Sequence, residues 1–422
     1  MISRRAFLKS GAFALFSASL GGAPFFLRRT ALAAENNTGY GRRKTLVTIF
    51  QRGAMDGLMA VPPLNDPLLA RSRPTLAMSA ARAAGENAAL DLNGQFGMHP
   101  AFSPLLPLFK ENRLAIVHGV GSPNPTRSHF DAQDYMESGT PFRKGTSSGW
   151  LNRAVGELGH EGAPFRAVAM TQTLPRSLYG EAPALAIANL ADYRIDLPEM
   201  PIAGVAAQNL EALYRQTTQD LLQNSGSNSF EAMKTLSARE IRNYRPANGA
   251  KYPKTTLGQS LRQIALLIKA GVGLEVAFAE SGGWDTHVQQ GTTRGAFARR
   301  AADLAQSIAA FWRDLGEARQ DNVMLMTMTE FGRTVRENGS GGTDHGRASC
   351  MFVLGNRVDG GKVHGSIPDR LEIDALADGR DLPVTTDFRA VFANVAGAHL
   401  NISRDDVMFP GWEGQRLALV KA

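Results

Sequence analysis

The stretch Gly341-Gly342-Thr343-Asp344-His345-Gly346 places an aspartate directly beside a histidine, between glycines. Neighbouring side chains of an extended strand point to opposite faces, whereas a glycine-rich bend lets Asp344 and His345 converge on one point. A carboxylate and an imidazole that converge are good ligands for a divalent metal ion. The pair alone also fits a solvated loop, so the interpretation depends on which other residues reach the same place.

Further candidate metal ligands follow other apolar runs. Asp56 comes soon after the run at 44–50, and its alternative role is to cap a turn. Asp285 and His287 lie in "GGWDTH", just after the run at 274–279, and both can face one point if the segment is extended. The alternative for His287 is a loop histidine that is hydrogen-bonded to its neighbour.

Ser128 is a candidate nucleophile or anion contact, because it lies where a helix should begin and helix N-termini favour phosphate and sulfate. A metal bound to a serine oxygen would make that oxygen nucleophilic. The sequence does not separate Ser128 from Thr126, and the alternative role of Ser128 is to cap the helix. Arg127 and Arg333 are candidate catalytic contacts to a substrate anion. A structural ion pair with Glu330 is the alternative for Arg333.

The elements that must position these residues alternate along the chain. Strand-like runs lie at 44–50, 114–119, 166–170, 274–279, 322–329 and 350–355. Helical patterns lie at 100–113, where prolines interrupt it, from Ser128 onward, at 297–318 and at 387–400. This alternation predicts an α/β fold with a largely parallel central sheet and helices on both faces. The polar segment 205–250 is predicted to be a helical insertion or lid.

In such folds ligands bind at the carboxyl ends of the strands. The candidate residues follow four different strand-like runs, and each of the four clusters brings carboxylates, histidines or glycines. The sequence therefore predicts one composite site for a divalent metal, to which Asp344 and His345 contribute one corner. The metal is expected to be Zn, Mn, Ca or Mg.

The N-terminus predicts export. Residues 3–9 read S-R-R-A-F-L-K, the twin-arginine pattern, and a mildly apolar segment and the small-x-small site Ala31-Leu32-Ala33 follow. We expect a signal peptide at 1–33, handled by the twin-arginine export machinery, and a periplasmic or secreted mature chain without a stable membrane span.

Charge and cysteine content exclude other classes of protein. Residues 1–33 carry five basic and no acidic side chains, so the formal net charge of +7 falls to +2 on cleavage. No basic run is interleaved with aromatic residues, so nucleic acid is not an expected partner. Cys350 is the only cysteine, which excludes an internal disulfide and a multi-cysteine metal site. Its apolar neighbours predict a buried side chain.

The remaining histidines are assigned by their neighbours. His364 is a candidate late metal ligand, because it follows Asp344 and His345 closely. Four others have no acidic neighbour at useful spacing and are interpreted as structural or surface residues: His99, His118, His160 and His399.

The motifs "QRGAMDGL", "TRSHFDAQDYMESG", "GGWDTH", "TEFGRT", "NGSGGTDHG" and "DFRAVF" together resemble the secreted family called domain of unknown function 1501. That family is similar in fold to the alkaline phosphatase and sulfatase superfamily. The resemblance covers the mature chain and implies a single alkaline phosphatase-like α/β domain over 34–422, with the metal site at the strand ends.

The resemblance also implies roles for residues. It matches Asp56 to the first-strand aspartate ligand, Asp344 and His345 to a late ligand pair, and Asp285 and His287 to the ligands of a second metal. It places the nucleophile at Ser128 or Thr126. The spacing of Asp285 and His287 is tighter than in the phosphatases, and the sulfatase Cys-x-Pro-x-Arg motif is absent.

These observations predict a periplasmic metal-dependent hydrolase of phosphate or sulfate esters, acting on a small anionic ester. The alternative is a non-catalytic periplasmic binding or assembly protein that retains a degenerate metal site.

Overall fold

The computed structural model describes residues 43–78, 88–160, 163, 165–191 and 243–421. The signal peptide predicted at 1–33 and most of the insertion predicted at 205–250 lie outside the described residues. The elements described below belong to one compact unit, Lys44–Ala422.

The strands are β1 (Thr45–Gln51), β2 (Leu90–Asp91), β3 (Gly97–Met98), β4 (Leu114–Gly121), β5 (Ala167–Ala169), β6 (Leu185–Ala186), β7 (Val276–Ser281), β8 (Val323–Met328), β9 (Ser349–Leu354), β10 (Val363–Gly365) and β11 (Thr386–Asp387). The larger helices are α6 (His129–Ser138), α7 (Trp150–Gly156), α11 (Thr256–Ala270), α12 (Ala296–Leu315) and α14 (Phe388–Leu400). The short helices are α3 (Gly57–Ala60), α4 (Pro67–Ser72), η1 (Pro100–Leu105), α5 (Leu106–Lys110), η2 (Arg176–Leu178), α13 (Glu317–Gln320), η3 (Ile373–Ala375) and α15 (Asp405–Met408).

Nine strands of the described chain form one sheet. Its order is β10-β4-β9-β8-β1-β7-β5-β6, and β11 also pairs with β4. β1 is parallel to both neighbours, with Leu46 opposite Val276 of β7 and Met324 of β8. β9 is antiparallel to β8 and to β4, whereas the other pairings in this sheet are parallel. The predicted largely parallel sheet is confirmed, and β9 is its one reversed strand among the described residues.

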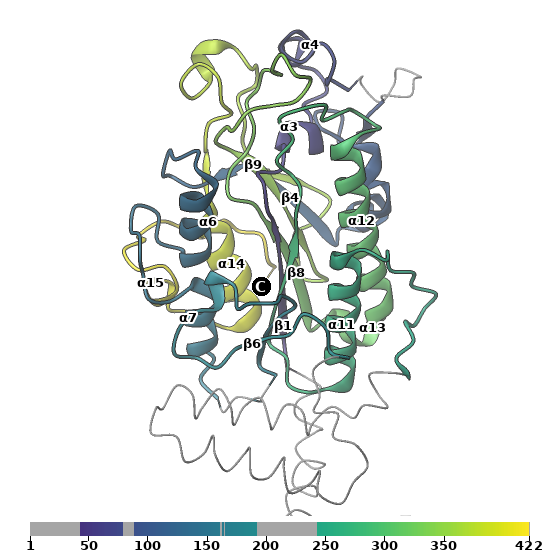
Figure 1. Ribbon diagram of the computed structural model, residues 1–422, viewed down its shortest axis with the longest axis vertical. Coiled ribbons are helices and arrows are strands. Elements are labelled where there is room, and N and C mark those ends of the chain that lie inside the picture. Colours follow the sequence, from purple (N-terminus) through teal and green to yellow (C-terminus); the bar gives the residue numbers. More distant parts are fainter. Residues whose placement is uncertain (1–42, 79–87, 161–162, 164, 192–242, 422) are drawn as a thin grey trace, which may run out of the picture. The chain divides into compact units, whose positions relative to one another are not determined.

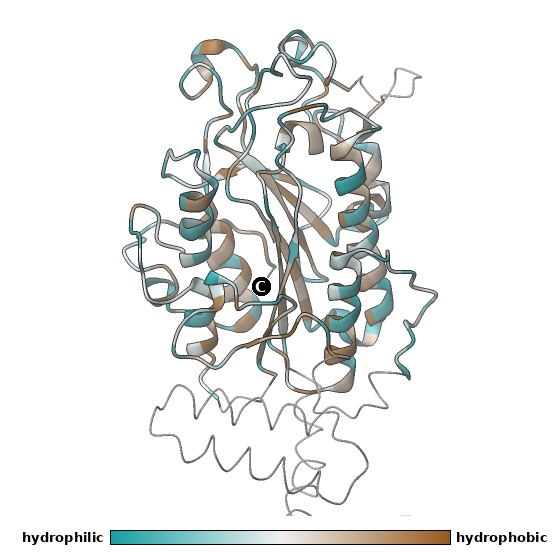
Figure 2. Cartoon of the chain, in the orientation of Figure 1, coloured by the Kyte–Doolittle hydropathy of each residue, from teal (hydrophilic) through white to brown (hydrophobic). Residues whose placement is uncertain are grey.

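Both faces of the sheet are buried, which explains why its strands are continuous apolar runs rather than alternating ones. All seven residues of β1 are buried. Its Val47 and Ile49 join the core with α11 and α12, whereas Leu46 and Phe50 join the core with α7 and α14. Figure 1 shows these helices on opposite sides of the sheet, and Figure 2 shows the apolar colour along the strands between them.

The helices follow from their apolar spacing. In α12 the buried residues Phe297, Ala301, Leu304, Ile308, Phe311 and Leu315 recur every three or four positions. The segment predicted as one proline-broken helix at 100–113 is split into η1 and α5. Pro104 and Pro107 lack the N–H groups that a continuous helix would need, which accounts for the break.

Strand direction determines at which edge of the sheet the candidate site residues lie. β1, β7 and β8 are parallel, and β4 runs the same way because it and β8 are both antiparallel to β9. The segments that leave the ends of these four strands therefore meet at one edge, the upper edge in Figure 1.

No helix in the described part of the chain has both the length and the apolar character needed to cross a lipid bilayer.

Candidate metal centre

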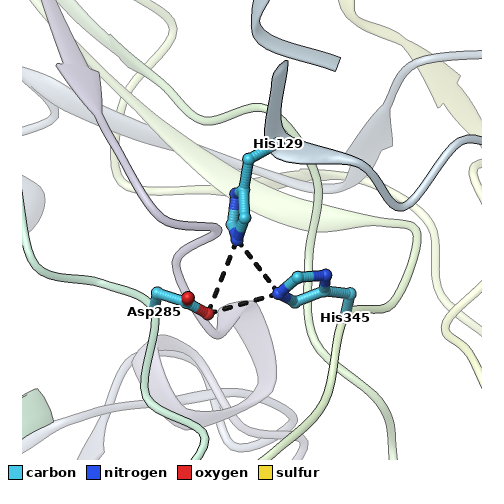
Figure 3. A group of neighbouring side chains, drawn as sticks. All are labelled: His129, Asp285 and His345. Atoms are coloured by element: carbon cyan, nitrogen blue, oxygen red, sulfur yellow. Dashed lines mark hydrogen bonds and ion pairs between the residues drawn. The ribbon is translucent and has the colours of Figure 1, made fainter. Parts of the chain in front are cut away.

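Three side chains from three of these segments meet at that edge. His129 is the first residue of α6 after β4, Asp285 follows β7, and His345 lies between β8 and β9. One atom of each lies within 4.8 Å of the others, which identifies a possible metal site (Figure 3). The two histidine side chains are 23% exposed and Asp285 is 44% exposed, so the cluster is accessible from solvent.

The spacing of these atoms fits coordination. His129 Nε2 lies 3.0 Å from His345 Nε2 and 3.5 Å from Asp285 Oδ1, and His345 Nε2 lies 3.3 Å from the same Oδ1. Ligand atoms about 2.0–2.1 Å from a tetrahedral ion lie about 3.4 Å from one another. The triangle therefore matches one face of a coordination tetrahedron.

His287 reaches the same cluster. Its Nε2 lies 2.8 Å from His345 Nε2 and 3.0 Å from Asp285 Oδ1, and its Nδ1 lies 3.0 Å from Asp344 Oδ1. His287 is therefore placed to contribute a third imidazole. Oδ1 of Asp344 contacts Nδ1 of His287 and accepts a hydrogen bond from the side-chain amide of Asn338. It supports a histidine rather than pointing its oxygen at the triangle.

The hydrogen bonds at Nδ1 fix the histidine tautomers. His129 Nδ1 lies 2.8 Å from Glu330 Oε1, and His345 Nδ1 lies 2.8 Å from the carbonyl oxygen of Arg127. Together with Asp344 at His287, all three partners accept hydrogen bonds only, so each Nδ1 donates its proton. Each neutral ring then directs an Nε2 lone pair at the same point as the Asp285 carboxylate. Convergent lone pairs repel one another, and a bound cation removes that repulsion.

Close approach of the loops requires glycine at two positions. Gly53 has φ of +111°, and a Cβ there would lie 2.5 Å from the backbone nitrogen of Asp285. At Gly342 a Cβ would lie 2.3 Å from the carbonyl oxygen of His287. A side chain at Gly53 would push the segment after β1 against Asp285, and a side chain at Gly342 would separate the loops that carry His287 and His345.

Arg333 holds Asp285 in its charged form. Its Nη2 donates to Asp285 Oδ1 at 2.5 Å, and its remaining nitrogens donate to backbone carbonyls that include those of Ala54 and Thr343. Burial alone would raise the pKa of Asp285, but the charge and hydrogen bond of Arg333 lower it overall. The Arg333 side chain is 0% exposed, so its guanidinium contacts the candidate metal ligand Asp285 and not solvent.

Glu330 is the acidic partner of His129. Burial alone would raise the pKa of its carboxyl group, but hydrogen bonds from His129 and Gln133 lower it overall. The hydrogen bond to Glu330 is in turn the largest cause of the raised pKa of His129. Glu330 and Arg333 thus pair with His129 and Asp285, respectively, and not as the structural ion pair that the sequence left open.

Asp56 lies at the same sheet edge but is engaged elsewhere. Its carboxylate accepts hydrogen bonds from Arg73 at 2.8 and 3.1 Å, from Gln290 at 2.8 Å and from the backbone of Met59 at 3.1 Å. Asp56 also caps the short helix α3, which matches the alternative role given by the sequence.

The candidate nucleophiles and Arg127 lie just before α6. Ser128 is the N-cap residue and exposed, but its side chain makes no capping hydrogen bond, whereas Thr126 Oγ1 accepts from the Ser128 backbone at 3.2 Å. Arg127 forms ion pairs with Asp378 and Asp381. The structure thus places Arg127 against two carboxylates, and only its backbone carbonyl contacts the cluster.

The remaining histidines have other partners. His364 is in β10, and its Nε2 lies 2.8 Å from the carbonyl oxygen of Asp359. His99, His118 and His399 are buried with backbone partners. His160 lies 3.1 Å from Glu275. Cys350 is buried as predicted.

His129 and Glu330 were not predicted as site residues. His129 has an acidic residue, Asp131, two positions further on, but its role emerges only when α6 brings it to His345. The available signal was its position: it is the first helical residue after an apolar strand, where ligand residues gather in this class of fold.

Comparison with known proteins gives a family and distant structural likenesses. The family described as "Protein of unknown function (DUF1501)" matches residues 115–408. No curated protein matches the chain. Similar solved structures include Ps i-CgsB in complex with k-i-k-neocarrahexaose, with 8% identity, a TM-score of 0.40, and coverage of 87% of this chain and 74% of that one.

Two sulfatase structures are also similar. PsFucS1 sulfatase from Pseudoalteromonas sp. has 10% identity and a TM-score of 0.33, covering 81% of this chain and 69% of that one. A sulfatase described as putative from Bacteroides thetaiotaomicron VPI-5482 has 10% identity and a TM-score of 0.32, covering 89% and 76%. These scores are too low to support an argument about activity.

Proposed function

The chain belongs to the DUF1501 family, and because that family description gives no activity, we propose from the site that it is a metal-dependent hydrolase of phosphate or sulfate esters that acts after export to the periplasm. One observation carries the proposal: three imidazole Nε2 atoms and the Asp285 carboxylate converge, with each Nδ1 held by an acceptor. The export step rests on the twin-arginine pattern of residues 3–9.

The donor set favours a particular kind of ion. Imidazole suits Zn²⁺ and other later transition metals, whereas Ca²⁺ and Mg²⁺ prefer oxygen ligands. Of the four ions expected from the sequence, Zn²⁺ therefore fits His129, His287, His345 and Asp285 best. When bound, such an ion polarises an ester oxygen and lowers the pKa of a coordinated hydroxyl group.

The chain's own residues would orient the substrate. Arg380 is 45% exposed, and its Nη2 donates to the carbonyl oxygen of His345 at 2.9 Å while its Nε donates to Asp381. This anchoring keeps a partly solvent-accessible guanidinium beside a ligand residue. Arg127 already pairs with two carboxylates and the Arg333 side chain is 0% exposed, so we assign contact with the ester anion to the more exposed Arg380.

The position of Ser128 suits a nucleophile that attacks the ester. It is exposed, directly precedes the ligand His129, and its hydroxyl makes no capping bond that would have to break. We therefore retain Ser128 as the proposed nucleophile and Thr126 as the alternative.

The test combines binding with turnover. Exported protein from its host is assayed for metal content, and Zn²⁺-loaded wild type is assayed on aryl phosphate monoesters, phosphate diesters and sulfate esters. We expect bound Zn²⁺ and turnover of at least one ester class, with both lost in His345→Ala. Wild type that binds Zn²⁺ tightly but hydrolyses none of these esters would contradict the hydrolase and favour the non-catalytic binding protein.

A further inference from the structure

Glu330 is an unusual carboxylate because it is fully buried beside the cluster. Its side chain is 0% exposed, and it lies directly after β8, at the edge where the ligands gather. A buried carboxylate is costly unless its oxygens are satisfied by hydrogen bonds. The partners that satisfy Glu330 therefore indicate its role.

Three donors share one oxygen of Glu330. Oε1 accepts from the backbone of Gly53 at 2.8 Å, from Gln133 Nε2 at 2.9 Å and from His129 Nδ1 at 2.8 Å. Oε2 lies 3.2 Å from the hydroxyl of Thr329. Glu330 thus joins the segment after β1 and two positions of α6, and the only imidazole among these partners belongs to a candidate ligand.

We propose that Glu330 is a positioning residue for His129, and that its negative charge strengthens metal binding through that ring. The carboxylate holds the Nδ1–H tautomer, aims Nε2 at the cluster and increases the electron density that Nε2 can donate. The inference rests on the metal site of the proposed function, but it concerns a residue that does not touch the metal.

A purely structural role is the competing explanation, and Glu137 is the matched case. Glu137 is another buried carboxylate, on α6 itself, with its side chain 4% exposed. It binds Arg52 at 2.7 Å and the backbone and hydroxyl of Ser177 at 2.9 and 3.1 Å. Loss of either carboxylate weakens the packing of α6, but only Glu330 reaches an imidazole of the cluster.

Glu330→Gln separates charge from hydrogen bonding. The remaining Oε1 can still accept from Gly53, Gln133 and His129. The new amide can donate to Thr329 Oγ1, because that hydroxyl can direct its own proton to the Gln51 carbonyl, 2.9 Å away. The variant should fold, since every buried partner keeps a bond while the charge is lost.

The experiment measures Zn²⁺ affinity by chelator competition in wild type, Glu330→Gln and Glu137→Gln, with thermal stability recorded for each. Replacing outer-shell partners typically weakens metal binding by about 10–100-fold, and we expect Glu330→Gln to fall in that range. Glu137→Gln should bind Zn²⁺ within about twofold of wild type, even if its stability falls more, since it lacks contact with the ligands.

A second measurement uses wild type and does not depend on the variant folding. In the Zn²⁺-loaded protein, ¹H–¹⁵N spectra of the imidazoles should show His129 with a protonated, hydrogen-bonded Nδ1, assigned by its loss in His129→Asn. Equal Zn²⁺ affinity in wild type and Glu330→Gln, or a His129 ring with a bare Nδ1, would overturn the inference. Wild type that binds no metal would instead refute the proposed function on which the inference rests.

Discussion

Asp56 and Arg73 form an ion pair in which both side chains are 1% exposed. Two hydrogen bonds join them, and Arg73 also donates to the carbonyl oxygens of Thr334 and Val335. Gln290 binds Asp56 on one side and, through its oxygen, Thr343 on the other. The pair therefore ties the segment after β1 to the loop that carries Asp344 and His345, and this determines what a mutation at Asp56 should do.

We expect Asp56→Asn and Arg73→Met to act mainly on stability. Removing one partner leaves the other buried without compensation, which typically costs about 3–5 kcal/mol. The free energy of unfolding from urea titration measures the effect, and Arg404→Ala, at an exposed ion pair with Asp406, is the control that should change little. An Asp56→Asn protein of unchanged stability that loses its metal would identify Asp56 as a ligand instead.

The cluster itself predicts which histidines bind metal. His129→Ala and His345→Ala should each lower Zn²⁺ affinity by more than about 100-fold, because losing a ligand should exceed the 10–100-fold effect of an outer-shell partner. His364→Ala is the matched control, since His364 in β10 contacts the carbonyl oxygen of Asp359 and lies outside the triangle. Isothermal titration calorimetry with Zn²⁺ measures the affinity of each variant. A large loss of Zn²⁺ affinity in His364→Ala, with the affinity of His129→Ala unchanged, would show that the metal binds at His364 and not at the triangle.

Much of the fold could be predicted because burial on both faces leaves a visible pattern. The run at 44–50 became β1, and the run at 350–355 became β9. The direction of β9 was not predicted, because apolar content carries no information on direction. The lack of a helix between β8 and β9 was the available clue, since parallel neighbours usually need a helical crossover.

The site was predicted less completely than the fold, for a physical reason. Asp285, His287 and His345 stand in glycine-rich motifs whose composition signals convergence. His129 and Glu330 are 201 residues apart, and nothing local marks them as partners. Arg73, 17 residues from Asp56, likewise becomes visible as its partner only in three dimensions.

Ser128→Ala should abolish ester hydrolysis while leaving Zn²⁺ affinity and stability nearly unchanged. The hydroxyl makes no capping hydrogen bond, so its removal should not incur the usual N-cap penalty of about 1 kcal/mol. Thr126→Val is the comparison, because it removes the acceptor for the Ser128 backbone. Steady-state turnover of the best ester is the measurement. Full activity in Ser128→Ala, with activity lost in Thr126→Val, would reassign the nucleophile to Thr126.

Arg380→Ala should raise KM for the anionic ester by roughly tenfold or more, as expected for one lost hydrogen bond to a charged group. Arg380→Lys should recover part of the loss, because it restores the charge but not the planar fork of donors. Zn²⁺ affinity should stay near that of wild type in both variants, since the hydrogen bond from Arg380 to His345 goes to the backbone carbonyl and not to the ring. An unchanged KM in Arg380→Ala would place the anion contact elsewhere.

The last prediction concerns acid stability and two histidines away from the cluster. Burial lowers the pKa of His118 to about 4, and burial likewise lowers the pKa of His399 to about 4. Their rings contact the carbonyl oxygens of Val61 and Thr45 at 2.9 and 3.0 Å. In the unfolded chain each should titrate near its ordinary value of about 6.5.

Between about pH 6.5 and pH 4 the unfolded chain therefore binds protons that the folded chain does not. The free energy of unfolding should fall as pH decreases through this window, by up to about 3 kcal/mol for each histidine. His118→Gln and His399→Gln keep a side-chain donor near each carbonyl but cannot titrate, so each should flatten the slope. Urea titrations at several pH values measure it, with His160→Gln, at an exposed histidine, as the control. A slope that survives in both buried-site variants would show that other groups control acid unfolding.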